Sequence, residues 1–234
     1  MPADLRRLTC MMRVEIWSDV VCPWCYVGTR NFDAAVQRFR AGGDGDDDID
    51  DLEVAYRAFE LDPTVPEGGM ELADYLARKF GSRGAVAAMH TRLAQAGADA
   101  GVDFRWEGMR RANTFDAHRL GVWAEEVGGA EARAVLEQRL FRACFTDNLD
   151  VGDHGVLARL AGEAGLDDTV AAEALAADTG ADRVRAEEAQ ATELGISAVP
   201  TFVIEGRWAI PGAQDADTFA QILRTAAGRL ASRP

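Results

Sequence analysis

The chain has few of the residues that mark metal-binding, membrane or nucleic-acid proteins. Its 234 residues include four cysteines, three histidines and a single lysine, Lys79. No apolar run approaches the length of a membrane span, so we expect no insertion into a bilayer. The formal net charge of −14 opposes binding to nucleic-acid phosphates and anionic membranes, because both require clustered basic side chains. We therefore expect neither nucleic acid nor membrane as a partner.

The N-terminal residues also lack the marks of an exported protein. Residues 1–11 contain no continuous apolar region and no small-residue cleavage site of the secretory kind. We predict a disordered tail over these residues, because the first β-prone segment follows them. We place the protein in the cytoplasm, where thiols are kept reduced.

Two of the cysteines stand three residues apart, in the segment Cys22-Pro23-Trp24-Cys25. β-prone residues precede this segment at 14–17, and apolar residues recur at helical spacing between 32 and 39. The pair therefore lies at the start of a predicted helix. Unpaired backbone N–H groups and the helix dipole favour negative charge at that position.

The position within the helix assigns a different role to each sulfur. The helix start stabilises a thiolate at Cys22, which we predict to be the nucleophile. Pro23 suits the first helical turn, because its missing N–H has no hydrogen bond to lose there. Cys25 falls one turn inward, close to Cys22 and less exposed, and is predicted to be the resolving thiol.

Three alternatives to a redox role stay open for the cysteine pair. A CxxC arises by chance in some chains with four cysteines. It can also form half of a zinc site, although no second CxxC exists and His90, His118 and His154 lie far apart in the sequence. A structural disulfide is the third, but so short a loop constrains the unfolded chain little. We favour a redox dithiol and expect no metal.

Strand-like segments frame a long helical region. Residues 42–51 are almost all Gly and Asp and predict a solvated loop, and residues 52–59 alternate as a strand does. Helical periodicity then runs from residue 71 to about residue 194. We predict helix boundaries at five positions within it, with N-caps at Asp153 and Asp167 and C-terminal caps at Gly97, Gly165 and Gly195.

Strand character returns near the C-terminus. Residues 199–204 and 208–210 flank Glu205-Gly206-Arg207 and predict a hairpin, and apolar residues from 219 to 230 predict a final helix. The order is βαβ, helices, ββα. It predicts an α/β protein in which a discontinuous domain, residues 12–66 and 196–234, carries a helical insertion at residues 67–195.

This order and several motifs resemble the DsbA family, and within it the FrnE-like branch. The resemblance extends from residue 14 to residue 214 and implies a thioredoxin fold with a large all-helical insertion. The matching residues are Ser18-Asp19, Cys22-Pro23-Trp24-Cys25-Tyr26, Gly28, Phe59-Glu60-Leu61, Asn113-Thr114, His118-Arg119-Leu120, Gly195-Ile196-Ser197-Ala198-Val199-Pro200 and Gly212-Ala213-Gln214.

The resemblance also implies a role for Val199 and Pro200. In that family the peptide bond before the matching proline is cis, and its loop faces the CxxC, so that a substrate backbone can pair with it. A cis bond before proline is energetically accessible, at about 0.5–1 kcal/mol. An ordinary position at a strand edge is the alternative for Pro200.

We predict that Pro23, Trp24, Asn113 and His118 contact substrate. The resemblance places a helical lid over the CxxC, which would bring the helix containing His118 close to it. Simpler roles remain open, because Asn113 suits a helix cap and His118 suits a place in the core. Cys144 lies on an apolar helical face and is predicted to be a buried, inert thiol.

Together these features predict a cytoplasmic thiol–disulfide oxidoreductase acting as reductase or isomerase on protein or small-molecule disulfides and thiols. Cys22 attacks a disulfide and Cys25 resolves the mixed disulfide.

We expect no tightly bound cofactor, a low-molecular-weight thiol as electron donor, and a monomer or homodimer. Two alternatives stay open. One, also suggested by the family, is a thiol-cofactor-dependent isomerase or reductase of a small aromatic or polyketide-like substrate; the other is a binding module without redox turnover.

Overall fold

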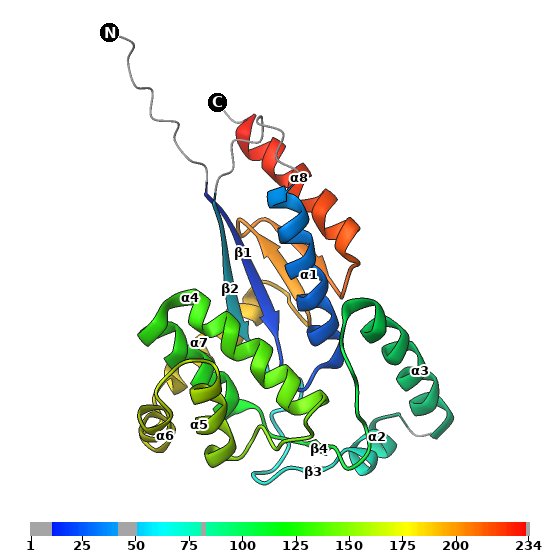
Figure 1. Ribbon diagram of the computed structural model, residues 1–234, viewed down its shortest axis with the longest axis vertical. Helices are drawn as coiled ribbons and strands as arrows, with labels where there is room; N and C mark the ends of the chain where they lie inside the picture. Colours follow the sequence, from blue (N-terminus) through cyan, green and yellow to red (C-terminus); the bar gives the residue numbers. More distant parts are fainter. Residues whose placement is uncertain (1–10, 42–50, 81–82, 233–234) are drawn as a thin grey trace.

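A four-stranded mixed sheet forms the centre of the fold (Figure 1). The computed structural model describes residues 11–41, 51–80 and 83–232. The strands lie in the order β2-β1-β5-β6, with β2 parallel to β1 and the remaining neighbours antiparallel. Their bounds are β1 Met11–Ser18, β2 Asp51–Ala58, β5 Thr201–Ile204 and β6 Trp208–Pro211. With the helix after β1 and the helix after β6, this is the predicted thioredoxin arrangement.

Two helices cover one face of the sheet, α1 (Pro23–Ala41) and α8 (Ala216–Ala231), which lie side by side in Figure 1. Side chains of a strand alternate between faces, so alternate β1 residues, including Val14 and Ile16, point into this layer. Phe32, Phe202 and Phe219 pack beneath the helices, and the rings of Phe202 and Phe219 lie 4.5 Å apart. Burial of these aromatic rings stabilises the layer.

The insertion supplies the other helices. The insertion elements are β3 Met70–Glu71, α2 Leu72–Phe80, α3 Arg83–Ala100, β4 Arg110–Arg111, α4 Phe115–Phe145, α5 His154–Glu163, α6 Asp168–Ala176 and α7 Ala181–Glu193. α7 covers the opposite face of the sheet, where its Ala191 packs with Trp17 and Val203. α4 packs on β2 and on α7, and α5 and α6 pack on α4.

Most of the predicted helix boundaries are confirmed. Asp153 accepts a hydrogen bond from the N–H of Val156, and Asp167 accepts from two amides at the start of α6. Gly165 and Gly195 follow α5 and α7 with positive φ. The prediction for Gly97 is wrong: it lies inside α3, where a Cβ would come 2.7 Å from the ring of Phe104. Gly97 therefore permits close packing.

Three further features differ from the sequence predictions or lie outside the described residues. Met11 belongs to β1 and pairs with Asp51, so the predicted tail over residues 1–11 is wrong at its last residue. Residues 1–10 and most of the predicted loop, 42–50, are not among the described residues. The insertion also contains the short antiparallel pair β3–β4. The sequence analysis did not predict it, because strands of two residues are too short to show an alternating pattern. The proposed domain boundaries stay a prediction.

A buried chain of ion pairs attaches the insertion to the sheet. Glu187 of α7 accepts a 2.7 Å hydrogen bond from the backbone N–H of Ala58 in β2 and pairs with Arg57 and Arg133. Arg133, on α4, is 1% exposed and also pairs with Glu125. Burial alone would raise the pKa of Glu187, but Arg133 offsets this effect and the pKa is lowered. The carboxylate of Glu187 is therefore ionised, and Arg57 and Arg133 balance its charge within the interface.

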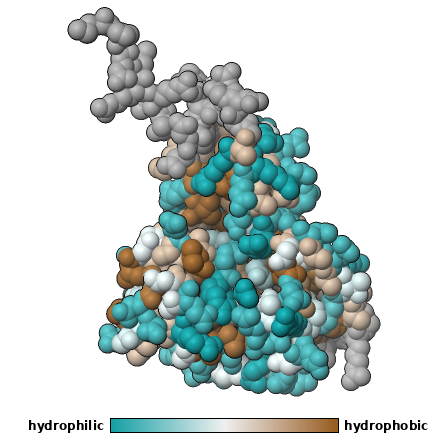
Figure 2. Space-filling model, in the orientation of Figure 1, coloured by the Kyte–Doolittle hydropathy of each residue, from teal (hydrophilic) through white to brown (hydrophobic). Residues whose placement is uncertain are grey.

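The visible surface is mostly hydrophilic, with apolar residues in separate patches (Figure 2). Such a surface fits the strong negative charge of the chain. None of the described helices combines the length and the hydrophobicity that crossing a bilayer requires.

We expect Arg133→Met to lower the free energy of unfolding by about 3–5 kcal/mol, because it leaves buried carboxylates without a counter-charge. Arg105→Met is the matched control, since Arg105 pairs with Asp103 on the surface with both side chains more than half exposed. We expect Arg105→Met to lower the free energy of unfolding by less than about 1 kcal/mol. Urea unfolding measures both, and equal losses would contradict the structural role assigned to the buried pairs.

Candidate active site

Cys22 lies directly before α1, whose first residue is Pro23, as predicted. The carbonyl of Cys22 accepts from the N–H groups of Cys25 and Tyr26, at 3.0 and 3.3 Å, and so begins the helix. Pro23 has no N–H, and at the first position of the helix an N–H would have no partner within the helix. Both cysteines are free thiols and lie close together as in a CxxC motif.

Cys25 is the more deeply placed thiol. The residue is 0% exposed, against 5% for Cys22. Burial and the adjacent Cys22 raise the pKa of Cys25 well above its usual value. The amide of Asp19 and the side chain of Ser18 lower the pKa of Cys25, but by less than burial and Cys22 raise it. Cys25 is therefore a protonated thiol that must lose a proton before it can attack a disulfide.

The loop before β5 lies against the CxxC. Its Val199–Pro200 bond is cis, as the resemblance implied. The Cys22 thiol donates to the carbonyl of Val199, with a sulfur–oxygen distance of 3.6 Å. Gly28 of α1 permits this approach, because a Cβ there would come 3.0 Å from the ring of Pro200. The structure thus brings Cys22, Cys25, Val199 and Pro200 together from the two ends of the chain.

A buried carboxylate holds the segment before the CxxC. Asp19 accepts from the N–H of Val21 at 3.3 Å and from the N–H of Leu61 at 2.7 Å. Its carboxylate also lies 3.7 Å from Nε2 of His118 on α4. Burial would raise the pKa of Asp19, but His118 and Arg111 outweigh it, so the pKa is lowered. Asp19 therefore carries a negative charge beneath the CxxC.

His118 is also enclosed, with 1% of its surface exposed. Burial alone would lower the pKa of His118, but Asp19 and, more weakly, Glu137 and Glu60 offset this and raise it. Neither ring nitrogen has a hydrogen-bond partner in the part of the chain that the structure describes. His118 is thus buried in the core, and the hydrogen bonds of its ring are not satisfied by the described residues.

Arg111 is a site residue that the sequence analysis missed. It is buried, it donates from Nη1 to the carbonyl of Val21 at 3.2 Å, and its guanidinium lies over the ring of Tyr75. The carbonyl that it binds precedes Cys22 directly. No local signal identifies Arg111, because strand β4 is only two residues long. Asp19 belongs to a motif that matches the family, but no sequence signal assigned it a role.

Trp24 and Asn113 occupy different environments. Trp24 is 37% exposed, although both neighbouring cysteines are buried. Asn113 accepts from the N–H of Phe115 and donates to the carbonyl of Val65, so it holds the start of α4. Its side chain lines a polar cavity of about 520 Å³ whose lining includes neither Cys22 nor Cys25. The contacts of Trp24, Pro23, Asn113 and His118 with substrate stay predictions.

Aromatic packing positions the start of α1 against the insertion. Tyr26, directly after Cys25, stacks on Phe141 of α4 with ring centres 5.3 Å apart, and it meets Phe104 edge-on. Cys144 is buried in the same core cluster. Its pKa is raised by burial, which fits the inert thiol that was predicted.

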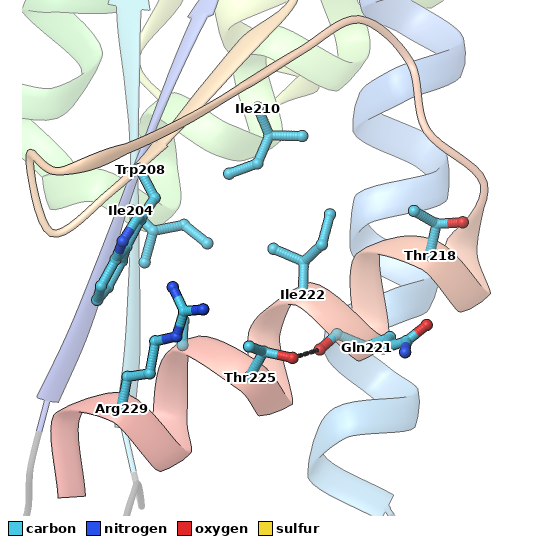
Figure 3. A pocket seen from close by; sticks show the side chains of 9 residues that line it. Ile204, Trp208, Ile210, Thr218, Gln221, Ile222, Thr225 and Arg229 are labelled. Carbon is cyan, nitrogen blue, oxygen red and sulfur yellow. Dashed lines mark hydrogen bonds between the residues drawn. The ribbon is translucent and has the colours of Figure 1, made fainter. Parts of the chain in front are cut away.

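A separate apolar cavity of about 370 Å³ lies between β6 and α8 (Figure 3). Ile204, Trp208, Ile222 and Arg229 contribute to its lining. Ile204 pairs with Val14 in the middle of β1, whereas Cys22 follows the end of that strand, and the lining of the cavity includes neither Cys22 nor Cys25. Within the described ranges, no group of three or more His, Cys, Asp or Glu side chains is placed to hold a metal ion.

Comparison with known proteins agrees with this geometry. The model of the DSBA-like thioredoxin domain family matches residues 13–224. A probable DsbA oxidoreductase from Streptomyces coelicolor has a similar structure, with a TM-score of 0.82 and 37% sequence identity over 95% of this chain and 92% of that one.

Two further proteins are similar at lower identity. The cytosolic disulfide reductase DsbM from Pseudomonas aeruginosa has a TM-score of 0.64 and 22% identity, covering 92% of this chain and 98% of its own, and has also been solved with GSH. The Bacillus subtilis (strain 168) protein YwbO is 27% identical over 214 residues, which are 91% of this chain and 96% of YwbO. The chain belongs to the DSBA-like thioredoxin domain family and is a DsbA-like disulfide oxidoreductase.

Proposed function

We propose that this protein is a cytoplasmic thiol–disulfide reductase or isomerase in which Cys22 is the nucleophile and Cys25 the resolving thiol. One observation carries the proposal: Cys22 lies at the start of α1, next to Cys25 and at the carbonyl of Val199. A helix start favours a thiolate, and the thiolate is the attacking form of cysteine.

The reaction proceeds by two exchanges. The Cys22 thiolate attacks one sulfur of a substrate disulfide, and the other sulfur leaves as a thiolate. Cys25 then loses its proton and attacks Cys22, which releases the second substrate thiolate and leaves a Cys22–Cys25 disulfide. Two equivalents of a low-molecular-weight thiol reduce that disulfide and become oxidised. When substrate cysteines rather than Cys25 resolve the first adduct, the outcome is isomerisation.

The cytoplasmic location and the reducing direction rest on two supports. The Pseudomonas neighbour is described as a cytosolic disulfide reductase and was solved with GSH. A glutathione-rich cytoplasm would also keep the dithiol reduced and ready to donate electrons. The small-molecule isomerase is less well supported, because both thiols of the CxxC are present and face each other.

We expect Cys25→Ser to accumulate a mixed disulfide when the reduced protein meets a peptide disulfide, because the adduct on Cys22 can no longer be resolved. Mass spectrometry of the acid-quenched protein identifies the modified residue. Cys22→Ser is the control and should form no such adduct. An adduct on Cys144 instead of Cys22 would refute the assignment of the nucleophile.

We expect the Cys22–Cys25 couple to have a reduction potential below about −200 mV, nearer to thioredoxin than to the oxidant DsbA. A reductase has to lie at or below the potential of the substrates that it reduces. Equilibration with glutathione redox buffers, followed by alkylation of the remaining thiols, measures this potential. A value near about −120 mV would instead indicate an oxidase.

We expect Trp24→Ala to raise KM for a peptide disulfide about 3–10-fold with little change in kcat, because Trp24 is the exposed part of the CxxC segment and losing its contacts weakens binding. Val170→Ala, which removes apolar surface that is 43% exposed on α6, is the matched control and should leave both constants unchanged. A fall in kcat alone would argue against a binding role for Trp24.

A further inference from the structure

The apolar cavity between β6 and α8 has the size and the walls of a small-molecule site. Its volume of about 370 Å³ lies in the usual range of ligand pockets, about 300–1,000 Å³. Ile204 in its lining belongs to the core beneath the sheet, whereas Ile210 and Ile222 pack on that core and stay partly exposed. Large apolar side chains that remain open to solvent around one cavity indicate a binding surface.

One cation faces this apolar space. Arg229 is the only charged residue in the lining that the structure describes. It lies in the last turn of α8, and its guanidinium lies 6.0 Å from the centre of the Trp208 ring. Figure 3 shows this guanidinium pointing from α8 toward Trp208 and Ile204. Asp217, the acidic residue of α8, pairs with Arg38 instead, and no carboxylate among the described residues pairs with Arg229.

The place of Arg229 near the end of a helix has a structural explanation as well. The C-terminus of a helix favours a cation, so Arg229 stabilises α8 wherever its side chain points. That effect does not require the guanidinium to face the cavity. Arg224 is also on α8 and exposed, but it does not line the cavity. The two arginines therefore separate a contribution to the helix from a contribution to the cavity.

A second copy of the chain fits this face poorly. β6 is an edge strand and could pair with another strand, but it has only four residues and ends in Pro211, which has no N–H to donate. Two copies would each carry a net charge of −14 and repel one another. A stable protein interface also buries about 800 Å² on each partner, whereas this cavity has the size of a ligand pocket.

We propose that the cavity binds a small monocarboxylate with an apolar tail, the carboxylate on Arg229 and the tail between Ile210 and Ile222. A guanidinium presents parallel N–H donors that match the two oxygens of a carboxylate. One cation balances one negative charge, which favours a monoanion in a chain that is otherwise strongly acidic. Binding is non-covalent, and it does not depend on the proposed function because neither Cys22 nor Cys25 lines the cavity.

Titration of isotope-labelled protein with octanoate, octanol and octylammonium tests the proposal by NMR. The indole N–H of Trp208, assigned with a Trp208→Phe variant, reports on the cavity. We expect octanoate to shift this signal with saturation and octanol to bind about 10-fold more weakly, because octanol lacks the ion pair. Octylammonium should bind more weakly still, since Arg229 repels it. Equal affinities for the three probes, or saturation by octanoate without a shift of the Trp208 signal, would overturn the proposal.

Variants of α8 separate the carboxylate from the tail. We expect Arg229→Met to weaken octanoate about 10-fold and to leave octanol unchanged, whereas the matched control Arg224→Met changes neither. Thr225 is an exposed residue of the lining, and Thr225→Trp should abolish binding of both probes by filling the cavity. Unchanged octanoate affinity in folded Arg229→Met refutes the role of Arg229, and if that variant does not fold, the three probes on the wild-type protein decide. A wild-type dimer that Thr225→Trp separates in sedimentation would assign the cavity to a second copy and overturn the proposal.

Discussion

The carboxylate of Asp19 is the constraint on which the site depends. One oxygen accepts from Val21 and the other from Leu61, and the group faces His118, so a single side chain joins the segments after β1 and β2 to α4. A buried charge left without partners costs several kcal/mol, so these three segments are held together. Cys22 follows Val21 directly, and its place at the start of α1 is set by the same contacts.

The insertion is therefore part of the site rather than a cover over it. Arg133 and Glu187 connect α4 and α7 to the edge of β2, and Tyr26 stacks on Phe141 of α4 directly after the second cysteine. Arg111 reaches the carbonyl before Cys22 from the short strand β4. The thioredoxin part supplies the thiols and the cis-proline loop, and the insertion supplies most of the buried charge around them.

Local signals account for what could be predicted. The Asp153 and Asp167 caps and the cysteine pair at a helix start are recognisable because the interactions that define them span only a few residues. The prediction for Gly97 failed because a glycine after an apolar run either ends a helix or makes room for a neighbour, here Phe104. Only the partner distinguishes the two cases, and that partner belongs to the loop after α3.

The sequence by itself determined the order of the elements, the redox pair and its place at a helix start. The signals behind these predictions, which are periodicity, turn residues and cap residues, each involve residues close together in the chain. It also carried the family resemblance through which Val199 and Pro200 were associated with Cys22. Only the tertiary structure decided that Asp19, His118 and Arg111 meet beneath the thiols. Burial and charge compensation bring Asp19 to two residues more than ninety positions away in the chain, and such long-range contacts leave no pattern in a single sequence.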